Sequence, residues 1–357
     1  MKKIGILTFH FPENRNFGAS LQTYACLNML KKIELNTEII DYNPFKLGSI
    51  GKLLYYLNGK NFKNYNQKFL KLACCCSNYE ELKNLNKKFD IFLVGSDQVW
   101  RAKYTQPDTS KYYFDFVDDN KTKIAYAASF GVDFWEGDKE LTEKIKPLAQ
   151  KFDYVSVREE SGIKICNNVF GIDAVCVLDP TLMIDKKDYQ PILDDWKDES
   201  HKKKKYIAHM LLDDTVVLRD ESNNIGKYLK SEINYIKGKD RKILGKTITF
   251  YNKVSQWLTY VKDAELVITD SFHCTVFSLI FNKKFVVVAN PERGTARLEN
   301  LLGIVGLKDR FFTNIKDVLK SGILDKNIDY VEVEKKLNVH REYSMNFLKK
   351  ALGESNE

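Results

Sequence analysis

The stretch LVITDSFHCT, residues 266–275, decides the fold class, because a strand pattern passes directly into a helix pattern. Leu266–Thr269 is an uninterrupted run of apolar and β-branched residues, which is typical of a strand covered on both faces. A helical pattern follows over Thr275–Phe281. The same succession recurs along the whole chain, and such alternation predicts an α/β protein with parallel sheets.

The remaining predicted elements repeat this alternation. Predicted strands are Ile4–Phe9, Thr37–Asp41, Ile91–Val94, Lys123–Ala127, Tyr154–Val157, Ala174–Val177, Tyr206–Leu211, Thr247–Phe250 and Phe285–Ala289. Predicted helices are Ala19–Lys32, Glu80–Lys87, Leu141–Lys151, Glu159–Cys166, Thr215–Lys230 and Val254–Val261, and a last amphipathic helix is predicted over Val331–Leu352.

The length of 357 residues predicts two domains, on a prior of about 150 residues per domain. We place the boundary near Leu178–Thr181, because a strand ends there, proline interrupts regular structure and a polar stretch follows. This gives an N-terminal domain of residues 1–178, a C-terminal domain of residues 179–330, and a C-terminal helix and tail of residues 331–357.

The composition excludes several classes of protein. With 44% hydrophobic and 29% charged residues, the chain can bury a core and is not a disordered protein. The 7 cysteines form no C-x-x-C pair and three are consecutive, which argues against a disulfide framework or a zinc site and for a reducing compartment. No apolar run approaches the ~18 residues that cross a bilayer. We therefore expect a cytoplasmic protein, with at most peripheral contact at the inner face of the membrane.

The formal net charge of +8 is small for the length of the chain. Such a surplus fits an acidic small molecule or an anionic membrane surface as well as nucleic acid. The basic residues are dispersed and form no recognition motif, so we expect no nucleic-acid partner.

Two loops at predicted strand ends carry polar side chains suited to sugar hydroxyls. Residues 10–22 offer Asn16, Gly18 and Gln22, although an ordinary strand-to-helix connection explains this loop equally simply. Residues 94–100 place Asp97, Gln98 and Trp100 after the strand Ile91–Val94, which gives a mixed polar and stacking surface. The alternative for the second loop is a turn in which Asp97 caps the next helix.

Three further strand ends carry groups suited to an anion. Arg158 follows the strand Tyr154–Val157, where a guanidinium forms two-point hydrogen bonds with a carboxylate or phosphate, or pairs with a neighbouring glutamate. His273 lies in or just before the first turn of a helix, where N–H groups and the dipole favour an anion and a protonated imidazole suits a general acid. Arg293 lies in the loop after Phe285–Ala289, and Arg297 starts the helical pattern that follows.

The segments NFGASLQ (residues 16–22), GSDQVW (95–100), SVRE (156–159), DPTL (179–182) and TDSFH (269–273) together resemble the polysaccharide pyruvyl transferase family, over roughly residues 3–310. The resemblance implies a GT-B-like fold, in which two Rossmann-like domains face each other across a cleft. It also implies an enzyme that moves the enolpyruvyl unit of phosphoenolpyruvate onto two hydroxyls of one sugar. The products are a cyclic pyruvate ketal and phosphate.

The resemblance also implies roles for individual residues. The family's essential histidine falls on His273, the arginine of its SVRE motif falls on Arg158, and a later basic residue falls on Arg293. We expect His273 and Arg158 to be catalytic and the C-terminal domain to bind phosphoenolpyruvate. The expected donor-binding residues are Arg158, Ser271, His273, Arg293 and Arg297.

The expected acceptor is a hexose of galactose type in a lipid-linked or polysaccharide intermediate, bound by the N-terminal domain. The expected acceptor-binding residues are Asn16, Gly18, Gln22, Asp97, Gln98 and Trp100. Phosphoenolpyruvate is a co-substrate in this reaction, and we expect no metal and no cofactor.

The chain departs from the family pattern at three positions. Ser271 stands where some members carry arginine, Cys274 where many carry glycine, and Ala19 where some carry an acid. Two other functions remain open at this point. One is a GT-B glycosyltransferase that uses a nucleotide sugar, and the other is a carbohydrate-binding relative without activity.

Overall fold

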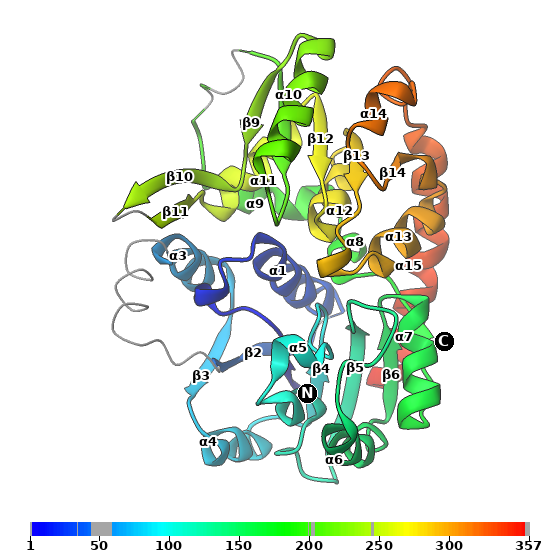
Figure 1. Ribbon diagram of the computed structural model, residues 1–357. Coiled ribbons are helices and arrows are strands. Elements are labelled where there is room, and N and C mark those ends of the chain that lie inside the picture. The colour runs from blue at the N-terminus through cyan, green and yellow to red at the C-terminus, as the bar shows by residue number, and fades with distance from the viewer. Residues whose placement is uncertain are drawn as a thin grey trace. The chain divides into compact units, whose positions relative to one another are not determined.

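The computed structural model describes residues 2–33, 35–43, 59–198, 200, 204–243 and 246–353. The chain forms two compact units (Figure 1). The chain leaves the first unit after Ile184 and enters the second at Asp185, whereas the boundary predicted from the sequence lies near Leu178–Thr181. The first unit comprises Met1–Leu53, Lys63–Ile184 and Leu337–Glu357, and the second comprises Leu54–Phe62 and Asp185–Lys336.

A parallel sheet of seven strands, in the order β3-β2-β1-β4-β5-β6-β7, forms the centre of the first unit. The strands are β1 (Lys3–Leu7), β2 (Asn36–Tyr42), β3 (Leu72–Cys76), β4 (Ile91–Val94), β5 (Thr122–Ala128), β6 (Tyr154–Val157) and β7 (Val175–Cys176). The helices are α1 (Phe17–Lys31), α3 (Lys60–Phe69, from Lys63 on), α4 (Tyr79–Asn84), α5 (Ala102–Thr105), α6 (Lys139–Ala149), α7 (Glu160–Ile165), α8 (Pro180–Met183) and α15 (Tyr330–Leu352, from Leu337 on).

A parallel sheet of five strands, in the order β14-β13-β12-β8-β9, forms the centre of the second unit, and a separate antiparallel hairpin β10–β11 follows β9. The strands are β8 (Tyr206–Met210), β9 (Glu232–Tyr235), β10 (Gly238–Ile243), β11 (Lys246–Tyr251), β12 (Leu266–Thr269), β13 (Lys284–Val288) and β14 (Phe311–Phe312). The helices are α9 (Gln190–Leu193), α10 (Val216–Leu229), α11 (Val254–Asp263), α12 (Phe272–Ile280), α13 (Ala296–Val305) and α14 (Asp317–Lys320).

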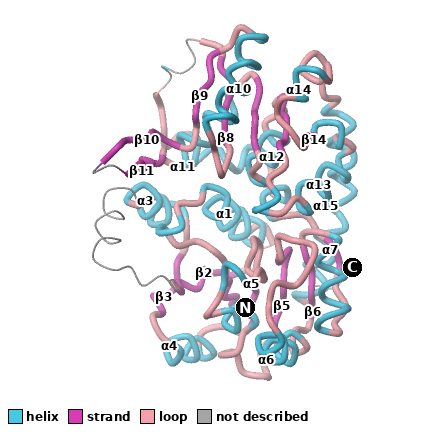
Figure 2. Tube along the Cα trace, in the orientation of Figure 1, coloured by secondary structure: helices cyan, strands magenta, loops and turns pink. Residues whose placement is uncertain are grey.

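Helices flank the strands of each parallel sheet (Figure 2), which leaves both faces of the central strands buried. Every residue of β4 and of β12 is buried, as their uninterrupted apolar runs predict. The α/β class with parallel sheets and the C-terminal helix are therefore confirmed.

Two element predictions need correction. Thr247–Phe250 was predicted as a strand of a parallel sheet, but it belongs to the antiparallel hairpin β10–β11, because its partner is the adjacent segment of chain. Helix α12 begins at Phe272 and not at Thr275, since the side chain of Ser271 already caps it by accepting from the N–H of Cys274. His273 thus lies within the first turn of this helix.

Candidate functional site

In the second unit, the loops that follow β8, β12 and β13 meet at the carboxyl edge of the sheet. Asn290 Nδ2, after β13, donates to Asp270 Oδ2 after β12 at 2.7 Å. The same nitrogen donates to Asp213 Oδ2 after β8 at 3.0 Å. Asp270 Oδ1 in turn accepts from the N–H of Leu212 at 2.8 Å. Three loops that are distant in sequence therefore form one hydrogen-bonded rim.

His273 lies in the first turn of α12, three residues after Asp270. Its exposed fraction is 6%, and its ring packs edge-on against Phe272, with centroids 5.2 Å apart. As the second residue of a nine-residue helix, it lies among the N–H groups at the positive end of the helix dipole. An anion bound at this helix start would lie next to the imidazole.

Arg293 is present at the rim, but its charge is already matched by a carboxylate. Its Nε donates to Asp213 Oδ2 at 2.8 Å, and its Nη2 donates to Asp213 Oδ1 at 2.7 Å. The hydrogen bonds from Arg293 lower the pKa of Asp213 to about 2, so Asp213 is ionised at neutral pH. Sequence reasoning missed Asp213, although it follows the end of β8 in the same way that His273 follows the end of β12.

Arg297 lies just inside α13 and is buried. Its Nη2 donates to the carbonyl of Arg293 at 3.0 Å. Arg297 therefore supports the loop that carries Arg293. Ser271, the cap of α12, is partly buried and lies at the same helix start as His273.

In the first unit, Arg158 is not at a surface. The exposed fraction of its side chain is 1%, and its Nη1 donates to Asp179 Oδ2 at 2.6 Å. Its Nη2 lies 3.6 Å from Asp97 Oδ1. Burial lowers the pKa of the guanidinium, but the carboxylates of Asp179 and Asp97 outweigh this effect and raise the pKa. Within this unit, Arg158 holds two buried acids that follow different strands.

Asp179 is the centre of that buried network. Its Oδ2 also accepts from Ser96 Oγ at 2.8 Å, and its Oδ1 accepts from the N–H of Thr181 at 3.0 Å and from the Thr181 hydroxyl at 2.5 Å. Ser96, Arg158 and Thr181 belong to three of the segments that carry the family resemblance. The network therefore explains why these segments occur together: they fix one another's loops at the carboxyl edge of the sheet.

The predicted acceptor-binding residues divide into two groups. Gln22 and Trp100 are fully buried. Gln22 Nε2 donates to Thr8 Oγ1 at 2.8 Å, while Trp100 stacks on Tyr113 at 4.9 Å and donates from Nε1 to the Tyr112 carbonyl at 3.1 Å. Both side chains are engaged within the core of the first unit, and their role in acceptor binding stays a prediction.

The other predicted acceptor residues have local roles. Asn16 is exposed and caps α1 by accepting from the N–H of Ala19 at 3.1 Å, and Gly18 is buried in the first turn of that helix. Asp97 is buried and accepts from the N–H of Gln98 at 2.9 Å, and Gln98 is partly exposed. Among the described residues, Asp97 Oδ2 is buried without a hydrogen-bond partner.

A sequence profile described as polysaccharide pyruvyl transferase matches residues 16–292. The chain belongs to the polysaccharide pyruvyl transferase family. This pyruvyl transferase is therefore an enzyme of the transferase class, and phosphoenolpyruvate is the pyruvyl donor in the family's general reaction. Comparison with curated protein sequences gives no match.

Solved structures similar to this chain include UDP-sugar enzymes with a GT-B-like fold. The S. aureus MnaA–UDP complex has a TM-score of 0.55 and 14% identity, with 100% of this chain and 98% of that chain covered. A putative UDP-N-acetylglucosamine 2-epimerase from Listeria monocytogenes has a TM-score of 0.56 and 10% identity, with 99% and 97% covered. At such identities the likeness shows the fold, which is GT-B-like as predicted.

None of the helices in the residues that the structure describes is both long and apolar enough to cross a membrane. Within the same residues, no three His, Cys, Asp or Glu side chains are grouped so that they could hold a metal ion.

Proposed function

We propose that the protein transfers the enolpyruvyl unit of phosphoenolpyruvate to two hydroxyls of a hexose, forming a cyclic ketal and releasing phosphate. The observation that carries the proposal is the position of His273 in the first turn of α12. The loop before this helix is joined to the loop of Arg293 by the hydrogen bond from Asn290 to Asp270. An acid, a helix start and a guanidinium thus lie on adjoining loops of one sheet edge.

The donor carries a carboxylate and a phosphate, so its site needs cations and oriented N–H groups. The first turn of α12 supplies N–H groups and the positive end of the helix dipole. Arg293 supplies a planar fork of the kind that binds carboxylate or phosphate at two points. Because Asp213 now occupies that fork, donor binding involves exchange or sharing of Arg293 between Asp213 and the donor.

In the proposed reaction, protonated His273 donates its proton to the terminal alkene carbon of the donor. The neighbouring carbon becomes cationic, and a sugar hydroxyl adds to it and loses its proton. The bond from that carbon to the phosphate oxygen then breaks, while the second hydroxyl adds and closes the ketal. The two hydroxyl protons balance the scheme, since one restores His273 and the other leaves with phosphate.

The role of Arg158 in donor binding stays a prediction, because its side chain is buried against Asp179 in the first unit. Its contacts support a positioning role for the loops after β4, β6 and β7. Arg297 is assigned the same kind of role beneath Arg293.

The family implies a polysaccharide acceptor, and we propose a galactose-type hexose on a lipid-linked intermediate. The net charge of +8 supports this choice, since a basic surplus favours an anionic inner membrane surface. Asn16 and Gln98 are the predicted acceptor residues whose side chains reach solvent.

The test is mass spectrometry of glycans after incubation with the protein and phosphoenolpyruvate, with phosphate release measured in parallel. We expect one added pyruvate ketal on a galactose-containing glycan and an equal amount of phosphate. A thermal-shift panel supplies the second measurement. Stabilisation by nucleotide sugars and not by phosphoenolpyruvate would favour a glycosyltransferase and contradict the proposal.

A further inference from the structure

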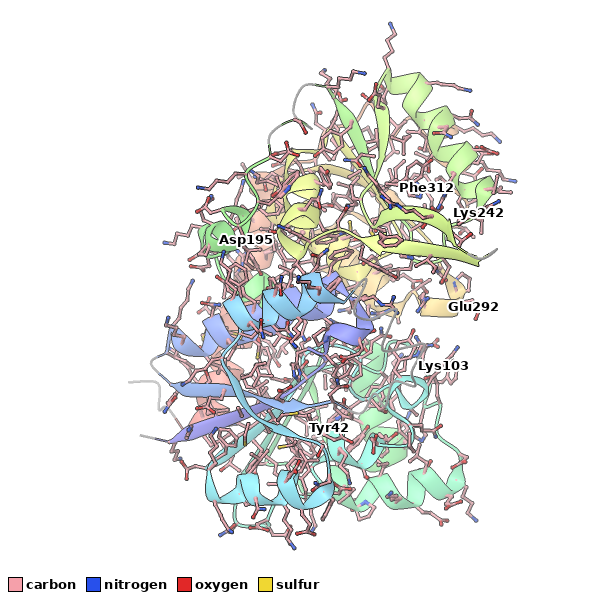
Figure 3. All side chains as sticks on the ribbon, turned by 90° about the vertical axis from the view of Figure 1, so that its left-hand side faces the viewer. Tyr42, Lys103, Asp195, Lys242, Glu292 and Phe312 are labelled. Carbon is pink, nitrogen blue, oxygen red and sulfur yellow. The ribbon has the colours of Figure 1, made fainter. Side chains whose placement is uncertain are left out.

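A cavity of about 710 Å³ lies within the second unit, between the loop after β8, the strand β9 and the hairpin β10–β11. Ligand pockets typically measure about 300–1,000 Å³. Lys242, labelled in Figure 3, belongs to this hairpin, and the strand pair forms one wall of the cavity. The function described above uses none of its lining residues except Asp213.

Arg219, on α10, ties the hairpin to the sheet. Its Nε donates to Asp214 Oδ2 at 2.6 Å, and its Nη2 donates to Asp240 Oδ2 on β10 at 2.9 Å. Asp240 Oδ1 also accepts from Thr249 Oγ1 on β11 at 2.7 Å. The polar wall is therefore held in place before any ligand enters, which lowers the entropic cost of binding.

His209 extends this network into the interior, with an exposed fraction of 2%. Its Nδ1 lies 3.0 Å from Ser222 Oγ, and that hydroxyl also donates to the Leu218 carbonyl at 2.9 Å. Its Nε2 lies 3.2 Å from Asp214 Oδ1. His209 thus links α10 to the loop after β8 inside the unit.

Asp214 is the carboxylate that His209 and Arg219 share. Burial raises the pKa of its carboxyl, but the hydrogen bonds and charges of His209 and Arg219 outweigh burial and lower the pKa. Asp214 is therefore ionised at neutral pH and is paired with Arg219.

The charges on the cavity wall nearly cancel. Its 3 carboxylates, Asp213, Asp214 and Asp240, are balanced by the lining cations Arg219, Lys237 and Lys239. Of these cations, Arg219 pairs with Asp214 and Asp240, and Lys237 Nζ donates to the Leu212 carbonyl at 2.9 Å. A nucleotide or a free phosphorylated metabolite would need a large cationic surplus, which this wall does not offer. Closely spaced donors and acceptors with little net charge suit a neutral ligand rich in hydroxyls.

We propose that this cavity binds a neutral hexopyranose unit of the acceptor glycan. The inference rests on the proposed function, and it adds an acceptor subsite in the second unit to the loops predicted in the first. Asp213 connects the two sites, because it lines the cavity and also holds Arg293 at the donor rim. A sugar in the cavity would therefore lie next to the carboxylate that pairs with Arg293.

The test measures binding of neutral methyl glycosides, including methyl β-galactopyranoside, to the full chain by saturation-transfer NMR and calorimetry. Thr247 is exposed, lines the cavity and pairs with Lys242 across the hairpin. Thr247→Tyr fills the cavity, suits a strand and leaves the Arg219 network intact. Asp240→Asn removes one carboxylate of the wall, and Asp309→Asn, at an exposed acid outside the cavity, is the control.

We expect at least one glycoside to bind the wild-type protein, with affinity reduced by about tenfold or more in Thr247→Tyr and Asp240→Asn and unchanged in Asp309→Asn. Stabilisation by phosphoenolpyruvate should be the same in wild type and Thr247→Tyr. Equal glycoside affinity in wild type and Thr247→Tyr, or no glycoside binding at all, would overturn the proposal. Sugar binding without pyruvyl transfer would contradict the proposed function but would still support a sugar site in this cavity.

Discussion

Arg293 and Asp213 form a two-point ion pair, with Nε to Oδ2 at 2.8 Å and Nη2 to Oδ1 at 2.7 Å. Both side chains are partly open to solvent, with exposed fractions of 39% and 47%. The guanidinium that we propose binds the anionic donor is thus already paired with a carboxylate that would compete with that donor. This relationship determines what substitutions at either residue should do.

Replacement of Asp213 by asparagine should strengthen donor binding. The change removes a negative charge next to Arg293 while an amide oxygen can still orient the guanidinium. We expect the KM for phosphoenolpyruvate to fall by about threefold, which corresponds to ~0.7 kcal/mol. Steady-state kinetics of Asp213→Asn against Asp309→Asn measure this effect. A raised KM would mean that the carboxylate is needed to position Arg293 and would contradict competition.

Replacement of His273 by alanine should remove the proton donor of the proposed reaction. We expect kcat to fall by ~10²–10⁴-fold, the usual contribution of one positioned acid, with a smaller change in the KM for phosphoenolpyruvate. Phosphate release at saturating substrates measures the loss. His340→Ala, at a partly exposed histidine of α15, is the matched control, and thermal melting checks that both variants fold. Near-normal turnover in His273→Ala would exclude an acid role.

Part of the fold was predictable because a strand that is buried on both faces consists of an uninterrupted run of apolar residues. The strands Ile91–Val94, Tyr154–Val157 and Leu266–Thr269 were predicted with the bounds that the structure shows. Strand β3, with the sequence LACCC, was missed because its consecutive cysteines and alanine do not mark a strand. Helix α3 was missed because its polar and aromatic residues, four of them asparagine or glutamine, give little helical signal.

The candidate site was predictable where its residues directly follow a strand. The position of His273 followed from a strand that runs into a helix. The partner of Arg293 could not be predicted, because Asp213 lies 80 residues earlier and only the order of β8, β12 and β13 brings the two together. Burial of Trp100 was missed for a related reason, since the aromatic side chains that enclose it come from later segments.

Removal of Arg158 should destabilise the first unit. Asp179 would be left as a buried carboxylate without its cation, and such losses cost about 3–5 kcal/mol. We expect Arg158→Met to lower the denaturation midpoint strongly and Arg158→Met/Asp179→Asn to recover part of the loss, because the second change removes the unpaired charge. Lys139→Ala, which breaks an exposed ion pair with Glu143, should have almost no effect. A midpoint in Arg158→Met equal to that of the wild type would contradict a positioning role.

Acid should weaken the first unit through Glu38, whose side chain is 11% exposed and lies 3.0 Å from Lys3 and 2.5 Å from Lys88. Burial raises the pKa of this carboxyl, but the two lysines outweigh burial and lower the pKa below its ordinary 4.5. An acid with a lowered folded-state pKa stabilises the fold above its unfolded-state value, and that stability is lost as the pH falls through the folded-state value. Glu38→Gln should therefore melt at a lower temperature than the wild type near neutral pH, and the difference should shrink as the pH falls below 4.5. The control is Glu143→Gln, in an exposed ion pair, which should melt at almost the same temperature as the wild type at every pH. If the melting difference of Glu38→Gln stays constant down to the lowest pH at which the protein folds, packing and not charge is responsible.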